Sequence, residues 1–136
     1  MRATAILVIS TAALVSHTAV AHVKRLTSIP EAFWGTWAPS AEVCKGADKS
    51  VIVLSAGAYV SPEANCRVAS VSETAGPKGP IYSAHLRCSK PAEKDRKTQS
   101  DVILSLKAPN QISLGSRFSN LKDYQRCSTN EPAPVR

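Results

Sequence analysis

The chain has 136 residues, with 17 lysines and arginines against 10 aspartates and glutamates. This length supports one domain with one modest hydrophobic core. The formal net charge of +7 favours a protein partner or an anionic component of a cell envelope. It does not favour nucleic acid, because the basic residues are spread along the chain and form no nucleic-acid-binding motif.

The first 21 residues have the pattern of a secretory signal peptide. Arg2 supplies a positive start, residues 5–15 form a short apolar run, and Ala19 to Ala21 has the small residues of a cleavage site. The apolar run is too short to span a bilayer. We therefore expect cleavage after Ala21, no membrane span in the mature protein, and a periplasmic or secreted location.

The mature chain then begins with a polar lead-in over residues 22–32 and continues as a single domain over 33–127. Short apolar runs alternate with turn signals, and no segment sustains a helical period. After a first strand that contains residues 35–37, the expected strands cover residues 51–55, 59–60, 65–74, 81–89, 101–107, 111–114 and 123–127. The charge cluster at 90–97 is expected to be a mobile, solvated loop, and 128–136 a flexible tail. This pattern predicts an all-β fold, either a small antiparallel β-barrel or a sandwich.

The segment from Gly76 to Pro80 is a strong turn signal between two of these strands. With a register centred on Pro77, Cys66 lies opposite Cys88 on a mostly apolar face. The same register predicts three further pairs on that face: Val68 with Leu86, Ser70 with Ala84, and Ser72 with Tyr82. A slip of one residue would separate the two cysteines.

Four cysteines form an even set, as expected of an exported domain with two disulfides. They allow three pairings. The hairpin register favours Cys66–Cys88, and elimination then leaves Cys44–Cys127, which ties the start of the domain to its end. Metal binding by the cysteines is the rival interpretation, but no CxxC or HxxxH spacing supports it.

A second hairpin is expected around Ala108 to Asn110. A register centred on Pro109 places Leu106 opposite Ile112 and Leu104 opposite Leu114, and these residues share one apolar face with Val102. Two hairpins that each have one apolar face require a common core, which a barrel or a pair of stacked sheets supplies.

The sequence Gly35-Thr36-Trp37, on the first expected strand of the domain, resembles the calycin barrels. That group includes lipocalins, avidins and small periplasmic inhibitors of secreted metalloproteases. The resemblance covers residues 33–37 and the general rhythm of strands and turns. It implies an antiparallel barrel in which Trp37 closes one end and Gly35 lets the strand bend past it.

The candidate binding residues are Phe33, Trp34 and Trp37. Side chains alternate along a strand, so Trp34 faces outward if Gly35 and Trp37 face the core. An exposed Trp34 beside Phe33 would be an anchor for a partner protein. The alternatives are that Trp34 packs under the lead-in and that Trp37 is a core aromatic.

We expect no metal and no cofactor. One alternative is a copper site, in which cleavage after Ala21 leaves His22 at the N-terminus and His85 becomes a third ligand. No GxSxG or HExxH motif is present, and His85 has no marked serine or aspartate partner, so we expect no enzymatic activity.

These observations predict an exported, non-enzymatic binding module. Its expected role is to dock on a protein, as an inhibitor of an envelope or secreted enzyme. One alternative is a carrier of a small apolar ligand inside a calycin-like barrel. The other is a structural envelope protein whose basic surface contacts an anionic polymer.

Overall fold

The computed structural model describes residues 14, 16, 22–45 and 50–127. The expected signal peptide therefore lies outside the described residues, apart from two positions, and the expected tail at 128–136 lies wholly outside them.

Within the described ranges the fold consists mainly of strands. The strands are β1 (Lys24–Leu26), β2 (Gly35–Ala38), β3 (Ile52–Leu54), β4 (Ala58–Val60), β5 (Asn65–Gly76), β6 (Gly79–Lys90), β7 (Glu93–Ala108), β8 (Gln111–Gly115) and β9 (Lys122–Arg126). The helical elements are the 3-10 turns η1 (Glu31–Phe33) and η2 (Phe118–Asn120) and the short helix α1 (Ala41–Lys45). None of these described helices has the length and apolar character needed to cross a membrane.

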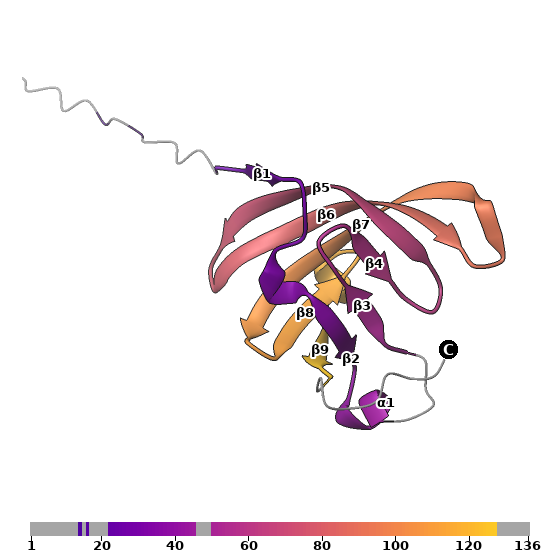
Figure 1. Ribbon diagram of the computed structural model, residues 1–136. Coiled ribbons are helices and arrows are strands. Elements are labelled where there is room, and N and C mark those ends of the chain that lie inside the picture. The colour runs from indigo at the N-terminus through magenta and orange to yellow at the C-terminus, as the bar shows by residue number, and fades with distance from the viewer. Residues whose placement is uncertain (1–13, 15, 17–21, 46–49, 128–136) are drawn as a thin grey trace, which may run out of the picture.

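The strands from β2 to β9 form a closed antiparallel barrel (Figure 1). Each strand pairs with the next along the chain, and β9 pairs back with β2, so the sheet closes on itself. Closure removes the two edge strands that an open sheet would have, although residues 93–101 of β7 pair with β6 alone. The predicted all-β fold is therefore confirmed, and the barrel is the correct form of it.

The predicted register of the β5–β6 hairpin is right at one end and wrong at the other. Cys66 lies opposite Cys88 and Val68 opposite Leu86, as expected. A bulge between Val68 and Ser70 then shifts the register by one residue, so the predicted pairs Ser70–Ala84 and Ser72–Tyr82 do not form.

The shift follows from the turn. Gly76 pairs directly with Gly79, so the connection is a tight two-residue turn, and Gly79 has a φ of +124° that a side chain would disfavour. The tight turn fixes one strand register, and the pairing of the two cysteines requires another that differs by one residue. The bulge between the two regions allows both registers in the same hairpin. As a result Val71, which is fully buried, lies opposite Ala84 on the core face.

Both predicted disulfides are present. Cys66 and Cys88 have Cα atoms 4.0 Å apart, and Cys44 and Cys127 have Cα atoms 5.4 Å apart. Cys44 belongs to α1, a helix that the sequence pattern does not predict. The two cross-links span 22 and 83 residues, and in the chain-entropy account each stabilises the fold by about 3–5 kcal/mol.

The second hairpin has the predicted register, with Leu104 opposite Leu114 and Leu106 opposite Ile112. Leu104, Ile112 and Leu114 are buried, as is Val102. Leu106 is 39% exposed, so it lies at the margin of the core although its face is the predicted one.

The polar lead-in is part of the fold. The lead-in contributes β1, which pairs with β5 at residues 71–73, and its Ile29 is completely buried and donates its N–H to the carbonyl of Ala56. The domain therefore begins before residue 33, because an apolar residue of the lead-in belongs to the core.

The charge cluster at 90–97 is not a loop. Lys90 ends β6 and lies opposite Glu93, the first residue of β7. This part of the hairpin projects from the body of the barrel (Figure 1), and its side chains are exposed. Because neither face is buried, the strand shows no apolar alternation, and the charges alone suggested a loop.

Candidate functional site

Trp37 closes one end of the barrel. Its side chain is completely buried, and its indole N–H donates to the carbonyl of Phe33 over 2.8 Å. The guanidinium of Arg126 lies 4.3 Å from the centre of the Trp37 ring system. This end therefore has an aromatic plug with a cation stacked on it.

Gly35 begins the strand that carries Trp37, and its backbone conformation is unusual. Its φ is +126°, a conformation that residues with a side chain rarely adopt. A Cβ atom at this position would lie 2.8 Å from Nη1 of Arg126. A side chain at position 35 would therefore be disfavoured both by the backbone conformation and by the contact with Arg126.

Arg126 holds the closed end together. Its guanidinium donates to the carbonyls of Trp34 and Ala32, just before β2, and to the carbonyl of Pro109 in the β7–β8 turn. The sequence pattern does not single this residue out, because one arginine on a short strand has no distinctive signal.

The three candidate binding residues do not form one exposed anchor. Phe33 is only 1% exposed and packs edge-on against Tyr82, with ring centroids 5.3 Å apart. Trp37 is buried in the plug. Trp34 alone reaches solvent, at 39% exposure, and its indole N–H donates to the carbonyl of Ile29 in the lead-in. Trp34 is therefore partly covered by the lead-in, as one alternative expected, and partly exposed to solvent.

The two histidines of the copper alternative lie in different places. His22 lines a shallow hollow beside the β5–β6 turn, with Gly76 and Gly79. His85 lies on β6, where its Nδ1 is 2.5 Å from a carboxylate oxygen of Asp101. No group of three or more metal-ligating side chains occurs within the part of the chain that the structure describes.

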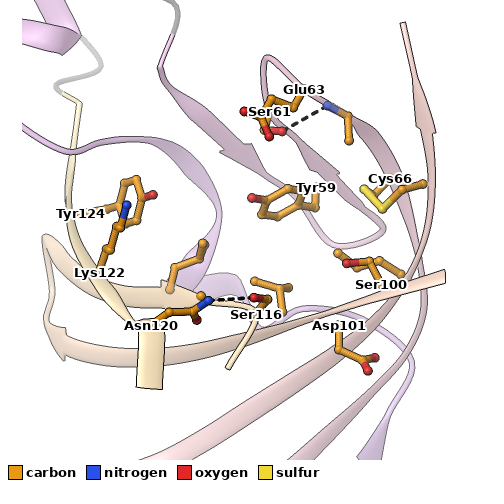
Figure 2. A pocket seen from close by; sticks show the side chains of 16 residues that line it. Tyr59, Ser61, Glu63, Cys66, Ser100, Asp101, Ser116, Asn120, Lys122 and Tyr124 are labelled. Carbon is orange, nitrogen blue, oxygen red and sulfur yellow. Dashed lines mark hydrogen bonds between the residues drawn. A yellow bond between two sulfur atoms is a disulfide. The ribbon is translucent and has the colours of Figure 1, made fainter. Parts of the chain in front are cut away.

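The opposite end of the barrel is open and holds a pocket of about 440 Å³ (Figure 2). Loops alternate between the two ends in a barrel of sequential antiparallel strands, so the β4–β5 and β8–β9 connections lie together at this end. The inward-facing side of β5, β6 and β7 completes the wall. A volume of this size is ordinary for a small-molecule site.

The floor of the pocket is apolar. Leu86, Val102 and Leu114 are each nearly buried, and the Cys66–Cys88 disulfide lies beside them. Below this floor, larger side chains fill the closed half of the barrel. The fully buried ones are Trp37, Phe33, Ile29, Leu54, Leu104, Ile112 and Val71. The hollow is therefore confined to the open half.

The rim of the pocket is polar. Tyr59 and Tyr124 lie on opposite sides of the opening (Figure 2), and Lys122 and Glu63 add one charge of each sign. Burial raises the pKa of Tyr59, and Tyr124 and Glu63 raise it further, whereas a hydrogen bond with Ser61 lowers it. Tyr59 therefore remains a neutral hydroxyl that can donate or accept a hydrogen bond.

Local hydrogen bonds order the rim loops. The side-chain amide of Asn120 donates to the hydroxyl of Ser116, and its oxygen accepts from the backbone N–H of Arg117. On the other side, the hydroxyl of Ser61 accepts from the backbone N–H of Ala64. These hydrogen bonds stabilise the conformations of the two loops that border the opening.

Sequence reasoning missed this set of residues. The available signal was the alternation of β9, which places Lys122, Tyr124 and Arg126 on one face. The pairs Leu114–Lys122 and Ile112–Tyr124 show that this face is the interior. An interior lysine at the end of a barrel indicates a solvated mouth rather than a core.

No protein family, curated protein or solved structure matches this chain.

Proposed function

We propose that this is an exported, non-enzymatic binding protein that takes a small amphipathic ligand into the open mouth of a calycin-like barrel. The observation that carries the proposal is the pocket itself, with an apolar floor and a polar rim in one half of a barrel whose other half is filled. This arrangement suits a ligand with an apolar body and a polar head.

The floor and the rim have separate roles in this proposal. Leu86, Val102 and Leu114 would cover the apolar part of the ligand, which gains about 25 cal/mol for each Å² removed from water. The hydroxyls of Tyr59 and Tyr124 and the ammonium of Lys122 would bind its polar head. The closed end, with Trp37 and its stacked arginine, would keep the barrel rigid.

Several features support export and the calycin-like assignment. Two disulfides are typical of exported proteins, and the N-terminal pattern is that of a signal peptide. The Gly35-Thr36-Trp37 sequence lies on the first strand of the barrel, with Trp37 at its closed end. Cleavage after Ala21 and a periplasmic or secreted location remain part of the proposal.

Anilinonaphthalene sulfonate, which has apolar rings and an anionic head, is a suitable first probe of the mouth. We expect it to bind the oxidised protein with enhanced fluorescence. Ser100 lines the pocket, so Ser100→Phe should fill the opening and weaken binding by about tenfold or more. Gln125→Phe, which adds the same ring on an exposed position of β9, is the matched control. Equal binding by both variants would contradict a site at the mouth.

A second candidate is protein docking through Trp34, because that residue has the exposed indole expected of an anchor. In this case Trp34→Ala should abolish inhibition of a secreted protease by the protein and leave probe binding at the mouth unchanged. Inhibition that survives the substitution would count against this surface.

A further inference from the structure

Two arginines lie side by side on the outer surface of the barrel, on neighbouring strands. Arg67 of β5 lies directly opposite Arg87 of β6, and Gln99 of β7 continues the row. Cys66 and Cys88, their neighbours in the chain, form the disulfide beside the inner pocket. Since side chains alternate along a strand, both arginines point outward. Both residues are exposed.

This arrangement is unfavourable without a counter-charge, because like charges directly opposite on paired strands repel each other. Within the described residues, the ion pairs are His85 with Asp101 and Lys107 with Asp123, so neither arginine is paired with a carboxylate. Asp101, the acidic residue two positions from Gln99, is held by His85.

The arginines also border a hollow of about 530 Å³ on this outer surface. Its lining consists of Arg67, Arg87, Lys97, Thr98 and Gln99. Three of these side chains are cationic, the other two are neutral and polar, and none is acidic. The lining therefore combines a formal charge of +3 with an excess of hydrogen-bond donors.

We propose that this hollow, which we call the arginine site, binds a phosphate group. A guanidinium presents paired N–H donors that match the oxygens of a phosphate, and two opposed guanidiniums can approach one phosphate from two sides. Three cations favour a phosphate, whose charge is about −1.5 to −2 near neutral pH, over a singly charged carboxylate. The site is separate from the ligand pocket, because it lies on the other face of the same strands.

The test uses two probes, inorganic phosphate and phosphatidylcholine vesicles that contain phosphatidic acid. Phosphate binding is followed by isothermal titration, and vesicle binding by co-flotation. We expect Arg67→Gln and Arg87→Gln each to weaken binding about tenfold. Arg25→Gln removes the same charge from β1 and is the matched control, with little effect expected.

Each outcome decides the proposal. Saturable binding of inorganic phosphate that depends on both arginines supports a site for any accessible phosphate group. Binding of the vesicles alone, with the same dependence, supports the site with a lipid headgroup as its source. No binding of either probe, or equal weakening by all three substitutions, would overturn the proposal, since net charge would then explain the result.

Thermal unfolding without phosphate provides an independent measurement. Because the two arginines repel each other, Arg87→Gln should raise the melting temperature of the ligand-free protein by about 1–4 °C. Added phosphate should stabilise the unmodified protein more than this variant. A lower melting temperature for the variant would indicate that Arg87 has a structural role instead.

Discussion

The substitution Arg126→Ala tests how the closed end of the barrel is held together. In the structure this side chain bridges segments that are far apart in sequence, because it contacts the backbone just before β2 and the β7–β8 turn. It also covers the buried Trp37 ring. Truncation to alanine removes all of these contacts and leaves the carbonyls of Trp34 and Ala32 without this donor.

The size of the effect follows from the contacts. Hydrogen bonds from a charged donor contribute about 1.5–3 kcal/mol when well formed, but these share one partly exposed guanidinium, and the contact with Pro109 is long at 3.4 Å. The cation–π contact adds about 0.5–1 kcal/mol. We therefore expect Arg126→Ala to lower the free energy of unfolding by about 3 kcal/mol. Arg126→Lys, which keeps the charge but loses the planar fork, should lose about half as much.

Equilibrium unfolding of the oxidised protein in urea is the appropriate measurement, with Arg25→Ala as the control. Arg25 is an exposed arginine on β1, so its truncation should change the free energy of unfolding by less than about 0.5 kcal/mol. If Arg126→Ala and Arg25→Ala have the same effect, the bridge does not stabilise the closed end. If Arg126→Lys has the same free energy of unfolding as the unmodified protein, a positive charge alone is sufficient to stabilise the closed end. The argument from the planar shape of the guanidinium would then be wrong.

Three further substitutions test other parts of the fold. Gly35→Ala should destabilise by about 1–3 kcal/mol in thermal unfolding, because the φ of +126° is strained for alanine. Replacing Cys66 and Cys88 together with alanine should cost about 3 kcal/mol in urea unfolding, as expected for a cross-link that spans 22 residues. A hydrogen bond from Lys107 is the main cause that lowers the pKa of Asp123 from its usual 3.8, so its contribution to stability is present above that pH and is lost as the pH falls through the lower, folded-state pKa. Asp123→Asn should therefore flatten the loss of stability below about pH 4, measured by melting temperature against pH.

Each of these expectations has a clear contrary result. A methyl group added at Gly57 would meet no atom within 4 Å, and this glycine has no positive φ, so Gly57→Ala should be neutral or slightly stabilising. If Gly35→Ala behaved like this control, the conformational argument would be wrong. If the double replacement of Cys66 and Cys88 left the urea midpoint unchanged, the disulfide would not stabilise the fold. If the melting temperatures of the unmodified protein and of Asp123→Asn fell in the same way as the pH was lowered, the Asp123 carboxylate would make no net contribution to stability.

Local signals predicted the parts of the barrel where adjacent strands meet through short turns. The pairs Cys66–Cys88 and Leu104–Leu114 follow from alternation and from the position of the turn residues. The same reasoning missed the bulge between Val68 and Ser70, because the turn and the disulfide prefer different registers and sequence alone does not show how the strand reconciles them.

The candidate site was harder to predict than the fold. The aromatic cluster suggests a binding surface, yet Phe33 and Trp37 are buried, since bulky aromatics near a strand start serve equally well as core. The pocket residues come from loops and strands distant in sequence. Tyr59 and Tyr124, for example, face one opening although they lie in opposite halves of the chain.

From its sequence alone, this chain was recognisable as an all-β domain with two disulfides, because strand alternation, turn residues and cysteine spacing are local properties. Only the tertiary structure decided that the sheet closes into a barrel, that one end is filled, and that Arg126 bridges that end. It also decided that an open pocket faces inward while Arg67 and Arg87 meet on the outer surface. Closure brings strands from across the chain together, and no local pattern records which of their side chains become neighbours.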